Sequence, residues 1–214
     1  MTSVRSTRTG VRKAGAADRD AVVSALAAAF EDDPVFAWIF PDLARRALLN
    51  RSFFELTVDV LAPHDDAWTS GDGVSGAALW VPYGRPALSE DDGERFAGAL
   101  AELAGPDAGR MLETVTLLDE HHPAGPHEYL WFLGVVPQAQ GTGIGSALMA
   151  PVLEQADRAG TPAYLEATSA RSKTLYERHG FVATAPIAVA GGPSLWPMWR
   201  RPAPVGRRAE RGRA

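Results

Sequence analysis

YLWFLGVVPQAQGTGIGSAL, residues 129–148, is the most informative stretch of this 214-residue chain. Its first eight residues are apolar or aromatic without polar alternation, which is typical of a strand buried in the middle of a sheet. Pro137 ends that strand, a glycine-rich turn follows, and residues 146–160 have the periodicity of an amphipathic helix that ends at Gly160. A strand, a glycine turn and a helix in this order predict an α/β arrangement.

The segments on either side continue the alternation of strands and helices. Hydrophobic periodicity and turn residues predict strands at 11–14, 66–69, 74–81, 162–168, 181–189 and 194–200. The same criteria predict helices at 17–30, 36–62 with a break at Pro41, 90–103, 107–121 and 172–180. No linker divides the chain, so we expect one domain over residues 10–200, between a flexible leader at 1–9 and a basic, disordered tail at 201–214.

Composition narrows the classes of function. Cysteine is absent, which excludes disulfide bonds, thiolate–zinc sites and a cysteine nucleophile. No apolar run approaches the ~18 residues of a membrane helix, and the first residues lack the apolar core of a secretory signal, so we expect a cytoplasmic protein without a membrane partner. The net charge of −5 combines an arginine-rich tail with an acidic body, which argues against a nucleic-acid partner. A monomer and a homodimer are both compatible with the sequence.

The glycine turn, residues 140–146, has the features of an anion-binding site. Glycines bring successive backbone amides close to a ligand, and the following helix N-terminus adds its positive dipole end, which suits a phosphate or pyrophosphate. A P-loop would need a lysine after the last glycine, and a dinucleotide fingerprint would need a glycine at Ser146. The pattern that fits is Q-x-x-G-x-G, met by Gln140, Gly143 and Gly145. A tight strand-to-helix turn without a ligand is the alternative interpretation.

Two segments, LGVVPQAQGTGIGSAL (133–148) and LEATSARSKTLYERHGF (165–181), resemble the GNAT superfamily of N-acetyltransferases. Within it, LAAAFEDDP (26–34), ERHGF (177–181) and GGPSLWPMWR (191–200) look like the subgroup that contains puromycin N-acetyltransferase. The resemblance implies a mixed α/β, GNAT-like fold with a central, mostly antiparallel twisted sheet, flanked by helices and splayed at the acetyl-CoA site. It also implies an acetyl-CoA-dependent N-acetyltransferase activity.

The same resemblance implies roles at the matching positions. The backbone of Leu133 and Val135 would hold the pantetheine arm and the acetyl carbonyl, the turn amides would hold the pyrophosphate, and Tyr176 stands where the family has its general acid. Serine occupies two positions, 169 and 172, at which members of the family carry asparagine. The predicted cofactor-binding residues are Leu133, Val135, Gln140, Gly141, Thr142, Gly143, Ile144, Gly145, Ser146, Ser169 and Ser172.

Acetyl transfer to an amine needs a neutral amine, a stabilised carbonyl oxygen and a stabilised leaving thiolate. Because the chain lacks cysteine, direct attack in a ternary complex is the simplest scheme. The Val135 amide can stabilise the oxyanion, and the Tyr176 phenol, with an ordinary pKa of ~10, can donate a proton to sulfur. Glu166 is our first choice of proton acceptor because a charged residue within an apolar strand needs a reason, with Glu128 and the carboxylates at 31–33 as alternatives.

The expected acceptor is the primary amine of a small molecule. Its pocket is predicted to include Glu31, Asp32, Phe36, Trp38 and Trp80. Two other functions fit the same sequence: an N-acetyltransferase for proteins or peptides, which needs an open groove, and a non-catalytic acyl-CoA-binding module. No metal is expected, because prolines interrupt the only histidine cluster, at 121–127.

Overall fold

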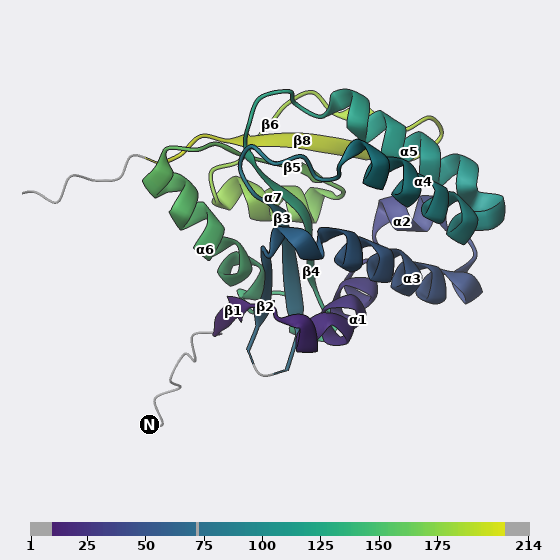
Figure 1. The fold of residues 1–214 in the computed structure, drawn as a ribbon, viewed down its shortest axis with the longest axis horizontal. Helices are drawn as coiled ribbons and strands as arrows, with labels where there is room; N and C mark the ends of the chain where they lie inside the picture. The colour runs from purple at the N-terminus through teal and green to yellow at the C-terminus, as the bar shows by residue number, and fades with distance from the viewer. Residues whose placement is uncertain (1–9, 72, 204–214) are drawn as a thin grey trace, which may run out of the picture.

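A computed structural model describes residues 10–71 and 73–203, so the predicted leader and residues 204–214 of the predicted tail lie outside the described residues. Within these ranges, eight strands pair in the order β1-β2-β3-β4-β5-β8-β6, and β7 also pairs with β8 (Figure 1). The strands are β1 (Val11–Lys13), β2 (Ala67–Ser70), β3 (Gly76–Val81), β4 (Glu128–Val135), β5 (Ala163–Ala167), β6 (Val182–Ala183), β7 (Ile187–Ala188) and β8 (Ser194–Arg200). The strand expected at 181–189 forms two short strands instead of one.

The sheet opens between its two central strands. All neighbouring strands are antiparallel except β4 and β5, which are parallel and pair only at Glu128 with Ala163 and at Tyr129 with Tyr164. Beyond these two pairs the strands separate, and Figure 1 shows β3 and β4 heading away from the direction of β5 and β8. The mixed α/β fold with a mostly antiparallel, splayed sheet is therefore confirmed.

Seven α-helices flank this sheet. They are α1 (Arg19–Ala29), α2 (Pro34–Ile39), α3 (Leu43–Leu61), α4 (Glu90–Ala104), α5 (Ala108–His121), α6 (Ile144–Ala159) and α7 (Ala170–Arg178) in the described ranges. One apolar core lies between the sheet and α1–α5, and a second lies between the sheet and α6 and α7. No helix in the described part of the chain is both long and apolar enough to cross a lipid bilayer.

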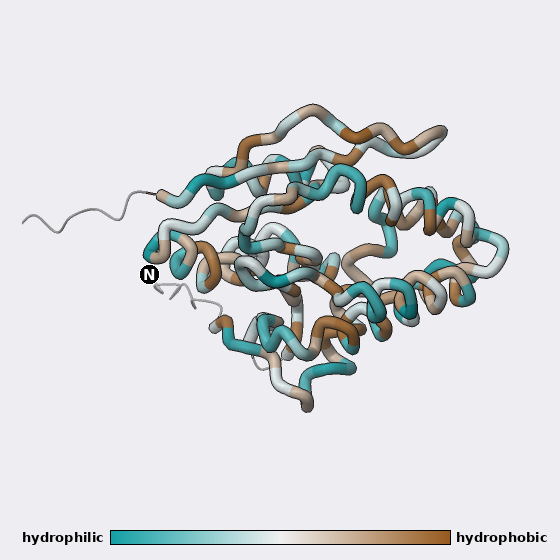
Figure 2. The backbone as a smooth tube through the Cα atoms, turned by 45° about the horizontal axis from the view of Figure 1, so that its top comes forward, coloured by the Kyte–Doolittle hydropathy of each residue, from teal (hydrophilic) through white to brown (hydrophobic). Residues whose placement is uncertain are grey.

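Strand β3 shows how the sequence pattern builds two cores. All six of its residues are buried, with Leu79 in the core beneath α1–α5 and Trp80 in the core beneath α6. Successive side chains of a strand point to opposite faces, so a strand covered on both sides is apolar throughout. The helices instead carry one apolar face each, and in Figure 2 brown and teal segments alternate along them.

Two local features of β4, a glycine and a bulge, shape the region where the sheet opens. Gly134 of β4 lets α1 approach closely, because a Cβ at this position would lie 2.8 Å from the Cβ of Ala29. On the β3 side, Leu79 pairs with Phe132 and Trp80 with Leu130, which leaves Trp131 as a bulge. Because α1 ends at Ala29, the α1–α2 connection, residues 30–33, begins next to β4 at the place where β4 has separated from β5.

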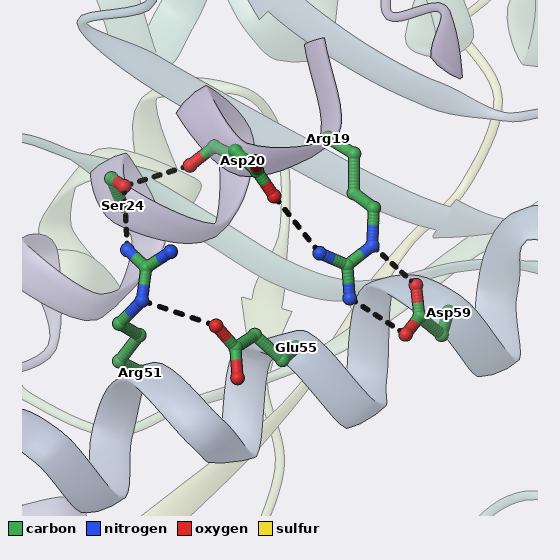
Figure 3. Close-up of polar contacts among 6 residues, drawn as sticks. All are labelled: Arg19, Asp20, Ser24, Arg51, Glu55 and Asp59. Atoms are coloured by element: carbon green, nitrogen blue, oxygen red, sulfur yellow. Dashed lines mark hydrogen bonds and ion pairs between the residues drawn. The ribbon is translucent and has the colours of Figure 1, made fainter. Parts of the chain in front are cut away.

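The outer side of α1 is tied to α3 by exposed polar groups, which we call the α1–α3 ladder: Arg19, Asp20, Ser24, Arg51, Glu55 and Asp59 (Figure 3). Arg19 donates from Nε to Oδ1 of Asp59 at 2.6 Å and from Nη2 to Oδ2 at 2.7 Å. Arg51 lies 3.1 Å from Glu55 and donates to the Ser24 hydroxyl at 2.9 Å. These contacts connect two helices that also share the apolar core beneath them.

Candidate active site

A cavity of about 1570 Å³ lies where β4 and β5 separate. One end, the loop end, is formed by the glycine turn, the first turn of α6 and one side of α7. The other end, the aromatic end, is lined by the side chains of Phe30, Phe36, Phe53, Phe96, Trp131 and Phe132. Every residue of β4 from Tyr129 to Val135 contributes to the lining, because this strand forms one edge of the opening.

The loop end presents unpaired backbone amides. Gly141 and Gly143 have φ angles of 79° and 91°, in the left-handed region that favours glycine. The first carbonyl of the helical ladder is that of Gly143, which accepts from the Ala147 N–H at 3.0 Å. The amides of residues 144–146 therefore have no partner within α6, and they lie at the positive end of its dipole. This geometry suits a diphosphate, as the glycine pattern predicts.

The edge of β4 that faces the gap offers further backbone groups. The N–H of Val136 donates to the Ser75 carbonyl at 2.9 Å, on the β3 side of the strand. Because successive N–H groups of a strand point in opposite directions, the Val135 N–H points into the gap, and so does that of Leu133. The Val135 carbonyl accepts a hydrogen bond from Nε2 of Gln140 at 3.0 Å, so this side chain braces the glycine turn against the strand.

Tyr176 lies on α7 with its side chain buried and lining the cavity. Burial raises the pKa of the Tyr176 phenol, and the negative charge of Asp33 raises it further. The phenol is thus protonated throughout the neutral range and can act only as a proton donor there. No described residue forms a hydrogen bond to its hydroxyl, which leaves the proton available to a ligand.

Asp33 is a site residue that the sequence analysis considered only as one of three neighbouring acids. It is the N-cap of α2, where Oδ1 accepts from the amides of Val35 at 2.9 Å and Phe36 at 3.3 Å. Its other oxygen accepts a hydrogen bond from the Thr168 hydroxyl, which follows β5. Burial raises the pKa of Asp33. The Asp-Pro pair at 33–34 was the available signal, because this pair is typical of a helix start.

Glu166 lies on β5 and is also buried, with its side chain 7% exposed. Oε2 accepts from the Tyr129 hydroxyl at 2.9 Å, whereas Oε1 has no hydrogen bond to any described residue and lies 3.9 Å from Nδ1 of His122. Burial, followed by the charge of Glu166, raises the pKa values of Tyr129 and Tyr164. Glu166 lines the cavity together with Tyr129 and His122.

Several predicted side chains have other surroundings. Trp80 is 1% exposed in the core beneath α6 and does not line this cavity, and neither do Glu31 and Thr142. Trp38 is also outside the lining; its indole donates to the Gly191 carbonyl at 2.9 Å. Phe36 lines the cavity, and its place in an acceptor pocket stays a prediction.

The remaining predicted residues line the cavity but have local partners. Asp32 is an exposed lining residue near the α1–α2 connection. The Ser169 hydroxyl accepts from the Ser172 amide at 3.1 Å and the Ser172 hydroxyl accepts from the Ser169 amide at 3.2 Å, so the two side chains cap α7. The Ser146 hydroxyl lies 2.9 Å from Nε2 of His179. In residues 10–71 and 73–203, no three His, Asp or Glu side chains are grouped to hold a metal ion.

A mostly antiparallel sheet that opens beside a glycine turn, with a buried phenol and buried carboxyl groups in the gap, is the arrangement that the resemblance to acetyltransferases led us to expect. The model of the acetyltransferase (GNAT) family matches residues 63–181, and the chain belongs to this family.

Solved structures have the same architecture. A Corynebacterium glutamicum structure described as histone acetyltransferase HPA2 and related acetyltransferase is 29% identical, with a TM-score of 0.68 over 92% of this chain and 99% of that chain. Arylalkylamine N-acetyltransferase 2 from Aedes aegypti is 15% identical, with a TM-score of 0.67 over 92% and 100%. The Drosophila melanogaster polyamine N-acetyltransferase is 17% identical, with a TM-score of 0.60 over 90% and 99%. At these last two identities the likeness concerns the fold.

Proposed function

We propose that the protein transfers an acetyl group from acetyl-CoA to the primary amine of a small molecule, by direct attack in a ternary complex. The observation that carries this proposal is the continuity of one cavity, which joins the amide-lined loop end to an aromatic end containing buried carboxyl groups. An acyl donor and an amine can therefore meet without crossing bulk water.

The loop end fits acetyl-CoA. The amides of residues 144–146 would bind its diphosphate, and the gap-facing backbone of Leu133 and Val135 would bind its extended arm. When bound, acetyl-CoA supplies a thioester whose carbonyl is the electrophile. The Val135 N–H already points into the gap, so it can stabilise negative charge on a carbonyl oxygen without reorganisation.

Two side chains near this position handle protons. Tyr176 donates a proton to the departing sulfur, since its raised pKa keeps the phenol protonated. The negative charge of Asp33 contributes to the raised pKa of Tyr176. The pKa of Asp33 is itself raised, which makes Asp33 a better proton acceptor than an exposed aspartate. We assign it the amine proton, received directly or through water, and keep Glu166 as the alternative that the sequence analysis favoured.

The walls of the aromatic end favour a small acceptor over a peptide. Phe36, Phe53 and Phe96 line the cavity and are each less than 10% exposed, so packed aromatic rings form the wall of this end. Two of the similar structures carry small-amine names, arylalkylamine and polyamine N-acetyltransferase, which agrees with this choice. The likeness to the puromycin N-acetyltransferase subgroup adds aminonucleosides to the amines that we would test.

The test combines cofactor binding and turnover. Calorimetry should detect coenzyme A binding to the full chain, and a panel of alkyl, aryl and nucleoside amines should release free thiol from acetyl-CoA. Ser146→Glu places a carboxylate among the phosphate-binding amides at a helix N-terminus that tolerates acids, and should abolish coenzyme A binding. Gly98→Glu, exposed on α4, is the matched control and should bind as the wild type does.

The outcomes separate the hypotheses. Binding without turnover of any amine would indicate a non-catalytic acyl-CoA-binding module. Turnover of peptides in preference to every small amine would replace the acceptor class while keeping the reaction. An absence of coenzyme A binding would contradict the proposed function itself.

A further inference from the structure

The Ser146 hydroxyl, at the loop end of the cavity, has a histidine as its partner. Ser146 lies in the first turn of α6, lines the cavity, and is next to the amides that we assign to the diphosphate. Its Oγ lies 2.9 Å from Nε2 of His179, at the end of α7, and forms no hydrogen bond with any other described residue. His179 is not itself among the described residues that line the cavity. The ring can thus affect a ligand there only through Ser146 or through its charge.

The direction of this hydrogen bond determines what Ser146 offers to a phosphate. A hydroxyl has one proton, so Ser146 donates either to the ring or to a ligand. When Nε2 carries a hydrogen, it donates to Oγ, and the Ser146 proton is free for a phosphate oxygen. When Nε2 is bare, it accepts that proton, and Oγ presents only lone pairs, which repel an anion. A diphosphate therefore favours the forms of His179 that have a hydrogen on Nε2.

The surroundings of His179 hold the residue in place and control the charge of its ring. The backbone carbonyl of His179 accepts from Nε of Arg200 at 2.8 Å, so β8 holds the residue without using its side chain. Burial lowers the pKa of His179, and the positive charges of Arg178 on α7 and Arg200 on β8 lower it further. The acid that α6 brings to this cluster, Asp157, is already paired with both terminal nitrogens of Arg200. The ring is therefore neutral at neutral pH while the site is empty.

We propose that His179 is a positioning residue for coenzyme A, which donates from Nε2 to Ser146 so that the Ser146 hydroxyl donates to the diphosphate, and which gains a proton when the diphosphate binds. This rests on the proposed function, because the ligand is the acetyl donor of the same site. The negative diphosphate favours the charged ring, which raises the pKa of His179 in the complex. Binding is then tightest at acidic pH, and this gain is lost as the pH rises through the raised value.

The probe for this linkage is 3′-dephospho-coenzyme A. It keeps the diphosphate but lacks the terminal 3′-phosphate, so its phosphate charge does not change near neutral pH. Calorimetry of the full chain should show about fivefold tighter binding at about pH 5 than at about pH 8, the range in which histidine changes charge. The measured heat should also depend on the ionisation enthalpy of the buffer, because a proton is taken up. An affinity that does not change with pH would overturn the proposal, whereas an absence of binding at every pH would contradict the proposed function.

His179→Gln places an amide nitrogen near the position of Nε2, so this variant still donates to Ser146 but cannot gain a proton. We expect it to bind the probe at about pH 8 as tightly as the wild type, without the tighter binding at about pH 5. A pH dependence that survives in this variant would assign the proton to another group and overturn the proposal. His121→Gln, at an exposed position of α5, is the matched control and should keep the wild-type pH dependence.

The Ser146→Ala background tests whether the ring acts through the hydroxyl. With Ser146 present, His179→Gln should weaken probe binding at about pH 5 about fivefold, and in the Ser146→Ala background the same change should weaken it less than about twofold. Equal losses in the two backgrounds would show that His179 acts by charge alone and would overturn the positioning role. Thermal melting checks that the variants fold, which we expect because Arg200 contacts the backbone of His179.

Discussion

The α1–α3 ladder and the two carboxyl groups of the cavity use the same residue types in opposite ways. On the ladder, Asp59 is 58% exposed and both of its oxygens accept from Arg19. In the cavity, the described residues that donate to Asp33 are all neutral, and none of the described residues forms a hydrogen bond with Oε1 of Glu166. Arginine lowers the pKa of Asp59, whereas burial raises the pKa of Asp33.

This contrast separates the charges that the fold pairs from those for which we propose a role in chemistry or binding. An exposed ion pair contributes little to stability, because water solvates the separated charges almost as well. A buried carboxylate without a counter-ion costs stability and changes its affinity for protons, which is useful only where chemistry or binding occurs. Charge-removing substitutions in the two regions should therefore have very different effects.

The largest effect is expected at Asp33. Asp33→Asn should lower kcat/KM about 100-fold, the scale of a lost proton acceptor, while asparagine keeps the cap of α2. Because the pKa of Asp33 is raised, the wild-type rate should fall as the pH drops through that raised value, and the variant should lack this limb. Steady-state kinetics across pH measure both effects, with Asp59→Asn as the charge-matched control. A wild-type rate profile for Asp33→Asn would return the role to Glu166.

Tyr176→Phe is the next strongest change. It should lower kcat about tenfold, because the proton donor to the leaving sulfur is lost, and should leave the affinity for coenzyme A unchanged. The loss is smaller than at Asp33 because a thiolate is a stable leaving group that depends less on protonation. Tyr83→Phe is the matched control and should retain full activity, because Tyr83 is an exposed loop residue outside the cavity lining. Stopped-assay rates and calorimetry together separate the two parameters. An unchanged kcat would show that Tyr176 only packs.

The ion pair of Arg200 and Asp157 is intermediate in exposure between the α1–α3 ladder and the carboxyl groups of the cavity. Arg200 donates to both oxygens of Asp157 at 2.7 Å, and its Nε donates to the His179 carbonyl at 2.8 Å, so β8, α6 and α7 meet there. Asp157→Asn should lower the free energy of unfolding by about 1–2 kcal/mol at neutral pH, the scale of lost charge-assisted hydrogen bonds.

Hydrogen bonds from Arg200 lower the pKa of Asp157 in the folded protein. The carboxylate therefore stabilises the fold above its ordinary pKa of ~3.9, and this contribution is lost as the pH falls through the lowered folded value. Urea unfolding of wild type and Asp157→Asn should give a difference that narrows toward pH 3. A constant difference would contradict the linkage.

The smallest effect is expected on the ladder. Asp59→Asn should change the free energy of unfolding by less than about 0.5 kcal/mol and leave kinetics unchanged, because the pair is exposed. What difference remains should shrink when salt is added. A loss comparable to that of Asp157→Asn would show that the ladder holds α1, and with it Asp33, in place.

Much of the fold was accessible from the sequence. The apolar run of β4, the break at Pro41 and the glycine turn are local signals, because strand burial, proline geometry and left-handed backbone are properties of a few adjacent residues. The turn's amides before Ala147 and the burial of Tyr176 beside the cavity agree with the sequence-based roles. Those roles stay predictions until the variants are measured.

The acceptor end was less accessible, for a physical reason. Trp80 and Trp38 were predicted to line it from residue type alone, but strand alternation points Trp80 into the opposite core, and a hydrogen bond holds Trp38 at Gly191. The hydrophobic pattern of a buried strand does not indicate which of the two covered faces of the sheet contains a ligand cavity.

Residue order predicts an α/β fold with a glycine turn suited to an anion, and the family resemblance adds the splayed sheet, since backbone preferences and hydrophobic patterning act over short distances along the chain. The contacts of Asp33 with Thr168, 135 positions away, and of Glu166 with Tyr129 arise only when distant strands and helices pack. Burial and pKa depend on every neighbour in space, so the chemistry of these carboxyl groups belongs to the tertiary structure.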